Sequence, residues 1–191
     1  DSVSLRVLEG RQETRELPVS ITLYQGLPKA EKMELIVQKA VELGAAAIVP
    51  VEMHRSVVRL DEKKAAVKQK RWQAIAEAAA KQAGRSVIPE VSLPLSFKEA
   101  LRRVEAEGTE LRLLPYERAA GMAATRDLIR SVKAGQRVAV MIGPEGGFEE
   151  TEVEAAEAEG FHALTLGKRI LRTETAGLVM LSLVMAETEE D

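Results

Sequence analysis

The chain has 191 residues, of which 46% are hydrophobic, 30% charged and 3% aromatic, with a formal net charge of −3. This composition is typical of a globular domain with an aliphatic core, and no apolar run approaches the length of a membrane-spanning helix. The sequence lacks cysteine, which excludes disulfides and thiolate chemistry and is compatible with a reducing cytoplasm. Its two histidines form no paired ligand motif, so we expect no metal site.

The first residues alternate between apolar and polar side chains. Two period-two runs, Val3–Val7 and Leu17–Leu23, flank a polar stretch at 11–16. We expect residues 1–18 to be the remnant of another unit, and residues 19–191 to form the main domain, with Ile21–Gln25 as its first strand.

Strand-like and helix-like segments alternate along the rest of the chain. Glycines or prolines punctuate them, and Ser96 and Glu99 form a capping box. This alternation predicts an α/β fold with a mostly parallel, doubly wound sheet. Further strands are expected at Ala46–Val51, Ser86–Val91, Leu111–Leu114, Val138–Ile142 and Ala163–Leu166, and helices at 28–43, Glu62–Ala83, 97–107, Ala123–Val132 and Ala176–Met185.

Positive charge is concentrated in one segment of this acidic chain. Residues 55–85 hold nine Lys or Arg against three Asp or Glu. Such a patch suits an anionic partner, but a solvated helix face with lysines explains it equally well.

Two glycine-containing loops follow the strands that end at Ile142 and Leu166. In an open α/β sheet, ligands bind beyond the carboxyl ends of the strands, where such loops gather. The first loop, residues 143–147, reads GPEGG and precedes three acids at 149, 150 and 152. These carboxylates disfavour a phosphate, so the loop suits a neutral or cationic ligand, unless it is only a tight turn.

The second loop, residues 166–175, has the opposite charge. It carries Arg169 and Arg172, although Arg172 could simply pair with Glu174 at the start of the next helix. That helix is apolar on nearly every face, which predicts burial on all sides. A C-terminal helix normally covers a sheet with one face, so we expect its other face to meet a second subunit.

Four motifs together resemble the RsmE family, the methyltransferases that modify N3 of a uridine in small-subunit (16S) ribosomal RNA. They read HRSVVR at 54–59, RWQAIAEAAAKQAGR at 71–85, IGPEGGF at 142–148 and LGKRILRTETA at 166–176. The resemblance runs from about Ile21 to the C-terminus. It implies the SPOUT fold with a C-terminal deep trefoil knot, a homodimer, a role in ribosome biogenesis, and an N-terminal PUA-like β-barrel of which residues 1–18 would be the remnant.

The resemblance also implies S-adenosylmethionine as the methyl donor, held by three knot loops at 114–118, 142–147 and 166–176. A loop containing Glu145 suits a cationic sulfonium better than it suits a phosphate. We expect the cofactor to contact Leu114, Glu117, Ile142, Gly143, Glu145, Gly146, Gly147, Leu166, Gly167, Ile170, Leu171, Thr175 and Ala176.

Methylation of uracil N3 needs removal of its proton and stabilisation of the resulting anion. We expect Arg172 to stabilise charge on a uracil carbonyl, and Glu145 to accept the proton or to face the sulfonium. Ribosomal RNA would contact Arg55, Arg59, Arg85 and Arg169. The alternatives are a non-catalytic RNA-binding module, a related methyltransferase acting on another RNA, and an enzyme that binds a nucleotide phosphate, which Glu145 disfavours.

Overall fold

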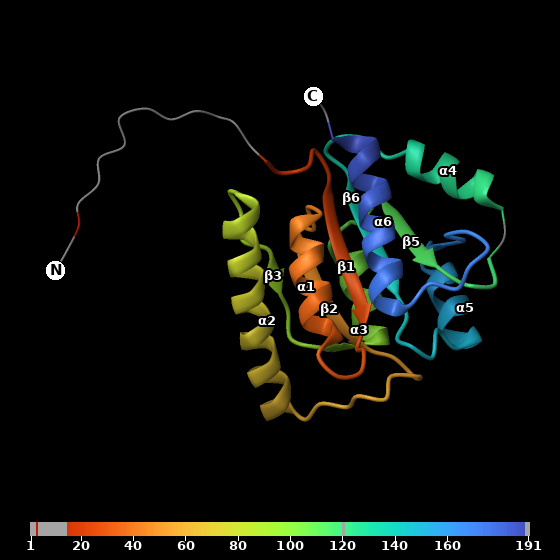
Figure 1. The fold of residues 1–191 in the computed structure, drawn as a ribbon. Helices are drawn as coiled ribbons and strands as arrows, with labels where there is room; N and C mark the ends of the chain where they lie inside the picture. The colour runs from red at the N-terminus through yellow and green to blue at the C-terminus, as the bar shows by residue number, and fades with distance from the viewer. Residues whose placement is uncertain (1–2, 4–14, 120, 190–191) are drawn as a thin grey trace.

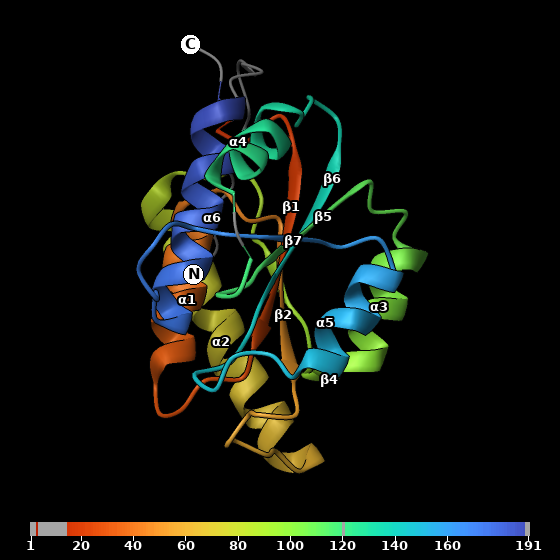
Figure 2. The ribbon, with the colours of Figure 1, turned by 90° about the vertical axis from the view of Figure 1, so that its right-hand side faces the viewer.

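A parallel sheet with helices on both faces forms the centre of the protein (Figures 1 and 2). The computed structural model describes residues 3, 15–119 and 121–189. The strand order is β3-β2-β1-β6-β5-β7, with β4 beside β2, and all strand pairs among the described residues are parallel. The strands are β1 (Ser20–Gly26), β2 (Ala47–Glu52), β3 (Glu90–Val91), β4 (Leu95–Ser96), β5 (Leu111–Pro115), β6 (Arg137–Ile142) and β7 (His162–Leu164).

The helices divide between the two faces of the sheet. Figure 2 shows α1, α2, α4 and α6 on one side, and α3 and α5 on the other. Two separate apolar cores, one under each set of helices, match this arrangement. The helices are α1 (Lys32–Glu42), α2 (Glu62–Ala83), α3 (Phe97–Ala106), α4 (Met122–Arg130), α5 (Glu150–Ala158) and α6 (Thr173–Thr188).

Strand β1 shows why the sheet must be covered on both faces. Ile21 and Leu23 pack into the core beneath α1 and α6, whereas Tyr24 packs into the core beneath α3 and α5. All three side chains are fully buried. Successive side chains of a strand point to opposite faces, so a run that is apolar at consecutive positions is stable only between two layers. The predicted doubly wound, parallel arrangement is therefore confirmed.

Helix ends follow the expected capping chemistry at several positions. The Glu99 carboxylate accepts the Ser96 backbone N–H at 2.8 Å, and the Ser96 hydroxyl accepts the Glu99 N–H at 3.3 Å. This confirms the predicted capping box. The helix expected from Pro28 begins instead at Lys32, because residues 28–31 form a turn in which Ala30 has a φ of 55°.

Other boundaries also differ from the predictions. Only Glu90–Val91 of the expected 86–91 strand pairs with β2, since Pro89 has no N–H to donate to a ladder. The final helix starts three residues before the expected Ala176, at Thr173. The expected Val3–Val7 strand lies outside the described residues except for Val3, and 17–19 is not a strand. No helix of the described residues is long and apolar enough to cross a membrane.

Arg85 anchors the segment that precedes β1. Its side chain is only 4% exposed and is paired with Glu16, and its Nη1 donates to the carbonyls of Val41 at 2.9 Å and Ala45 at 2.7 Å. Burial acts to raise the pKa of Glu16, but hydrogen bonds and charge from Arg85, with backbone N–H groups, outweigh it and lower that pKa. The expected RNA contact of Arg85 is therefore wrong, because its guanidinium is consumed inside the domain.

We predict that Arg85→Ala lowers the free energy of unfolding by about 2–3 kcal/mol, because it leaves buried carbonyls without a donor and removes the ion pair with Glu16. Arg130→Ala, at an exposed position of α4, should change it by less than about 0.5 kcal/mol. Urea unfolding measures both.

The stabilisation from Glu16 should be present above an ordinary carboxyl pKa and be lost as the pH falls through the lowered pKa. Equal stability of the two variants would contradict this role.

Candidate active site

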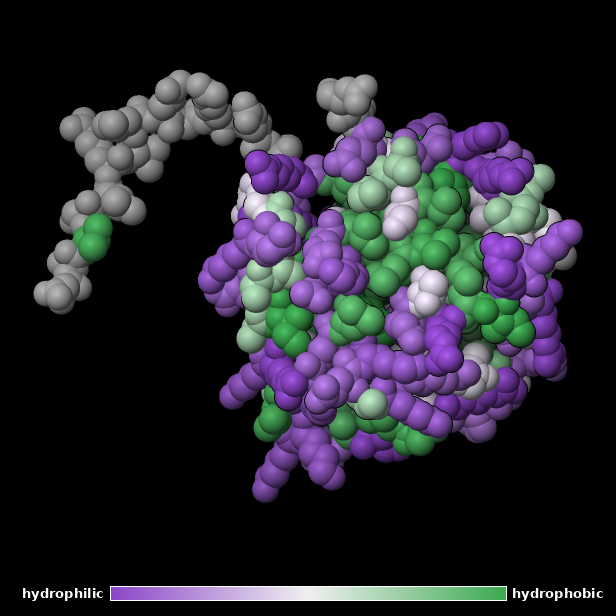
Figure 3. Space-filling view, in the orientation of Figure 1, coloured by the Kyte–Doolittle hydropathy of each residue, from purple (hydrophilic) through white to green (hydrophobic). Residues whose placement is uncertain are grey.

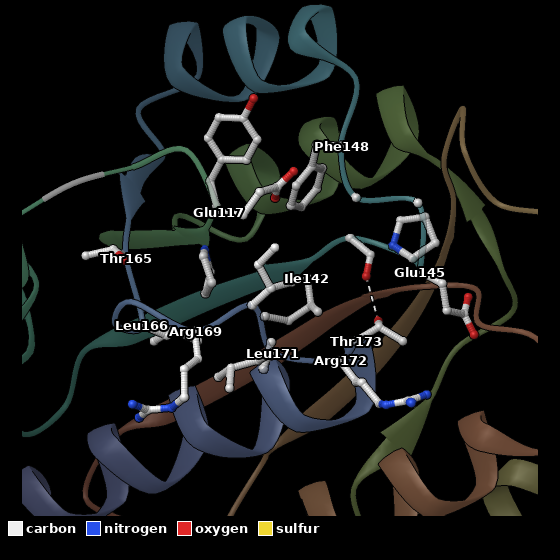
Figure 4. A pocket seen from close by; sticks show the side chains of 18 of the residues that line it. Glu117, Ile142, Glu145, Phe148, Thr165, Leu166, Arg169, Leu171, Arg172 and Thr173 are labelled. Atoms are coloured by element: carbon white, nitrogen blue, oxygen red, sulfur yellow. Dashed lines mark hydrogen bonds between the residues drawn. The ribbon is translucent and has the colours of Figure 1, made fainter.

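A cavity of about 430 Å³ lies beyond the carboxyl ends of β5, β6 and β7. Its volume is within the usual range for small-molecule sites. The walls come from three segments, 115–117, 142–148 and 165–173 (Figure 4). Lys32 and Ala176 also line the cavity. Parallel strands bring these loops to one edge of the sheet, where the sequence pattern placed a ligand.

The GPEGG loop is a tight turn in which Gly147 is required by its backbone conformation and Gly146 by the space available. Gly147 has a φ of 69°, and a Cβ there would lie 3.1 Å from Oε1 of Glu117. A Cβ on Gly146 would lie 2.9 Å from the Cβ of Arg55. Backbone therefore forms this wall of the cavity, and a ligand can approach it closely.

The hydroxyl of Thr173 joins this loop to the start of α6. It donates to the carbonyl of Gly143 at 2.6 Å, the bond drawn in Figure 4, and it accepts from Nε2 of Gln25 at 2.8 Å. Gln25 is fully buried and Thr173 is 5% exposed. Buried hydrogen bonds of this kind hold groups in a single arrangement. Strand β1, the loop after β6 and helix α6 are thus fixed to one another.

Glu145 is held from outside the cavity rather than directed into it. Its carboxylate accepts the Lys29 backbone N–H at 3.0 Å and lies 3.1 Å from Nζ of Lys32. Figure 4 shows the side chain extending away from the centre of the cavity. Burial acts to raise the pKa of Glu145, but backbone N–H groups and Lys32 outweigh it, so the pKa is lowered. A carboxylate with a lowered pKa and satisfied oxygens is a poor proton acceptor, which argues against that role for Glu145.

Arg172 precedes α6 with extended backbone and an exposed side chain. The possible pairing of Arg172 with Glu174 is not present, because Glu174 lies 3.1 Å from Nζ of Lys32 instead. The Arg172 guanidinium forms no ion pair with any residue in the described part of the chain. It is therefore available at the edge of the cavity. Arg169 is exposed as well and lines the cavity.

Three acids near the start of α5 were expected to crowd a possible anion site. Glu152 instead accepts the backbone N–H groups of Glu149 at 2.9 Å and His54 at 2.8 Å. Glu149 pairs with Arg55 at 2.9 Å, which lowers the pKa of Glu149. Glu150 pairs with Arg118. These carboxylates cap the helix and bind neighbouring arginines, outside the cavity.

Most of the residues expected at a cofactor site line this cavity, but two do not. Leu114 is fully buried in the core beneath α3 and α5, and Thr175 lies outside the lining. Lys32, Tyr116, Phe148, Thr165 and Thr173 also line the cavity but were not expected there; of these, Tyr116 and Thr173 lie within predicted loops, and Thr165 and Phe148 directly adjoin one. The expected residues that line it are Glu117, Ile142, Gly143, Glu145, Gly146, Gly147, Leu166, Gly167, Ile170, Leu171 and Ala176.

Two of the expected RNA contacts lie close to this edge of the sheet. Arg55 donates to the carbonyl of Gly146 at 3.1 Å, so it borders the glycine loop from outside. Arg59 donates to the carbonyl of His54 at 3.2 Å and is 3.8 Å from Glu52. Both stay partly exposed and lie in surface ion pairs that contribute little to stability. No His, Cys, Asp and Glu cluster that could hold a metal occurs among the residues described.

The fold and the cavity define an α/β protein with a small-molecule site built from loops at one sheet edge. The model of the RNA methyltransferase domain family matches residues 15–185. A relative from Bacillus subtilis (strain 168), ribosomal RNA small subunit methyltransferase E, is 41% identical over 99% of this chain and 74% of its own length. A structure of the enzyme of that name from Neisseria gonorrhoeae, bound to S-adenosyl methionine, is 38% identical, covers 90% of this chain and 68% of its own, and has a TM-score of 0.77.

A methyltransferase structure from Legionella pneumophila with bound S-adenosylmethionine gives a TM-score of 0.80 at 37% identity, over 91% of this chain and 68% of its own. The chain therefore belongs to the RNA methyltransferase domain family, among the ribosomal RNA small subunit methyltransferases E, which the sequence motifs resembled.

We predict that Thr173→Val lowers the free energy of unfolding by about 1–3 kcal/mol, because the buried carbonyl of Gly143 loses its donor while the volume is preserved. Thr175→Val is the matched control, since the Thr175 side chain forms no hydrogen bond with a described residue. Urea unfolding of both variants is the measurement. A Thr173→Val protein as stable as Thr175→Val would contradict the role of the Thr173 hydroxyl in linking β1, the glycine loop and α6.

Proposed function

We propose that the chain uses S-adenosylmethionine to methylate N3 of a uridine in small-subunit ribosomal RNA. The observation that carries this proposal is the cavity formed by 115–117, 142–148 and 165–173. The Neisseria gonorrhoeae member of the same family was solved with bound S-adenosyl methionine. Ribosomal RNA as substrate would place the reaction in the cytoplasm, during ribosome biogenesis.

The residues present suit such a donor. Leu166, Ile170 and Leu171 offer aliphatic surface for an adenine ring, and Gly143 and Gly147 offer backbone. Glu117 presents a carboxylate beside Gly147, where a cation is better accommodated than a phosphate. When bound, the donor supplies a methyl group on a positively charged sulfur. We assign its binding to these residues and to Ile142, Gly146, Gly167 and Ala176.

Arg172 is the residue to which we assign stabilisation of the substrate. Deprotonated uracil carries much of its charge on the two carbonyl oxygens beside N3, and a guanidinium without a partner can donate hydrogen bonds to one of these oxygens while N3 stays open to the methyl donor. This stabilisation makes loss of the N3 proton easier. Glu145 is not the proton acceptor in this proposal, because Lys32 and Lys29 already occupy its carboxylate.

RNA is expected to lie across the cavity edge. Arg55, Arg59 and Arg169 are exposed there in part or fully, and we assign them contacts to phosphates that position the RNA without reading its bases. Residues 1–18 are proposed as the remnant of a PUA-like barrel that would add RNA affinity.

We also propose a SPOUT knot and a homodimer. Helix α6 packs on α1, β1 and β6 in the middle of the sheet, although β7 before it lies at the edge, so residues 165–172 must cross between them. One face of α6 stays open, with Leu183 38% exposed and Val179 half-buried, and Figure 3 shows an apolar surface there. This face runs on to Ala176 in the cavity, so a second copy packed on it would border the site.

We predict that Arg172→Ala reduces methyl transfer about 10²–10³-fold, as for loss of one donor to a developing anion. Its affinity for S-adenosylmethionine should stay within about tenfold, or ~1.4 kcal/mol. Methyl transfer to small-subunit ribosomal particles, with mass spectrometry of the methylated nucleoside, provides the measurement. Arg102→Ala, exposed on α3, is the control. Absence of donor binding by the unaltered protein would point to a non-catalytic RNA-binding module, and donor binding without transfer to small-subunit particles would point to a methyltransferase that acts on another RNA.

We predict that the protein sediments as a dimer at micromolar concentration and that Leu183→Asp makes it monomeric, because a charge would be buried in the apolar contact. Leu93→Asp, at a position 53% exposed between β3 and β4, should leave the dimer intact. A monomeric mass for the unaltered chain would refute the homodimer.

A further inference from the structure

Lys32, the first residue of α1, bridges two walls of the cavity. Its Nζ lies 3.1 Å from Oε1 of Glu145 in the glycine loop and 3.1 Å from Oε2 of Glu174 in the first turn of α6. Its side chain is 28% exposed and lines the cavity. One ammonium group thus forms ion pairs with two carboxylates that belong to separate segments.

The turn before α1 holds this ammonium in place. The Lys29 N–H donates to both oxygens of Glu145, at 3.0 and 3.3 Å. Between Lys29 and Lys32, Ala30 adopts a φ of 55°, which costs a non-glycine residue conformational energy. Hydrogen bonds from Lys29 and charge from Lys32 therefore converge on one carboxylate through a strained turn, and such strain persists only where surrounding contacts maintain it.

Arg172 is close in sequence to one of these acids, yet it forms no ion pair with either of them. Glu174 follows it by two residues, and Figure 4 shows the side chains of Arg172 and Glu145 extending to the same side of the cavity. A guanidinium beside two unneutralised carboxylates would readily form a charge-assisted, bidentate pair. An Arg172 paired in that way could not donate to a substrate carbonyl.

We propose that Lys32 is a positioning residue that holds Glu145 and Glu174 and thereby keeps the Arg172 guanidinium free for the substrate. The part of this inference that concerns substrate rests on the proposed function; the part that concerns the pairing of Arg172 does not. A purely structural role, in which Lys32 only links α1 to the cavity walls, would use the same two ion pairs. We call this alternative a strut; the two roles predict different results when both acids are removed together with Lys32.

The experiment compares Lys32→Gln, Lys32→Arg and the triple variant K32Q/E145Q/E174Q with the unaltered protein. Lys39→Gln, which breaks the Lys39–Glu42 ion pair on the same helix, is the control for loss of a lysine from α1. Initial rates of methyl transfer to small-subunit particles and calorimetric affinity for S-adenosylmethionine are measured for each. Urea unfolding verifies that every variant is folded.

Lys32→Gln is expected to lower the maximal rate at least about tenfold, with donor affinity changed less than about threefold, because Arg172 becomes occupied. Lys32→Arg should retain most of the rate, and the triple variant should recover at least about tenfold over Lys32→Gln, because no carboxylate is left to bind Arg172. Lys39→Gln should match the unaltered protein. A strut predicts no recovery in the triple variant, and that result would overturn the proposal, as would full activity of Lys32→Gln.

A second readout does not depend on activity. The side-chain Nε–H signal of Arg172, assigned by its loss in Arg172→Lys, should exchange rapidly with water in the unaltered protein, become slow and shifted in Lys32→Gln, and return in the triple variant. An Arg172 signal that is the same in all three proteins refutes the inference. Absence of donor binding or methyl transfer in the unaltered protein would refute the proposed function instead, and the Arg172 signal would still decide the role of Lys32.

Discussion

The hydrogen bond from the Thr173 hydroxyl to the carbonyl of Gly143 fixes two of the three loops that form the cavity relative to each other. The bond is buried, and Nε2 of Gln25 in β1 donates a second hydrogen bond to the same hydroxyl. Because α6 begins at Thr173, the position of its N-terminal turn is set relative to the glycine loop, and Arg172, the residue before it, is placed at the edge of the cavity. Together these two buried hydrogen bonds specify one arrangement of three segments that are distant in the sequence.

Four carboxylates around the cavity are already engaged by neighbouring groups. Glu145 and Glu174 bind Lys32, Glu149 binds Arg55, and Glu152 accepts backbone N–H groups. Arg172, by contrast, is unpaired within the described residues. An enzyme that must stabilise a developing anion benefits from a cation that is positioned but unoccupied before the substrate arrives. Glu145 of the glycine loop, which in the sequence disfavours a phosphate, contributes to this arrangement because it pairs with Lys32.

Periodicity and capping residues predicted the layers of this fold well, because each strand had to be apolar on both faces and Ser96 and Glu99 mark a helix start unambiguously. The sequence predicted the three cavity segments but not their internal chemistry. Nothing local to Lys32 indicates that it meets Glu145 and Glu174, far along the chain. Nothing local to Thr173 indicates that it meets Gly143 and Gln25, 30 and 148 positions away. The predicted RNA contact of Arg85 was wrong for the same reason. A basic residue after a helix resembles an exposed cation in the sequence, and only the structure shows that it donates to the carbonyls of Val41 and Ala45.

The most direct measurement is a calorimetric titration of the purified protein with S-adenosylmethionine, S-adenosylhomocysteine and ATP. The account predicts saturable binding of the first two at about one molecule per chain, since the cavity combines aliphatic surface, glycine backbone and the Glu117 carboxylate. It predicts no binding of ATP, whose phosphates would meet that carboxylate. Binding of ATP alone, or of none of the three, would contradict it.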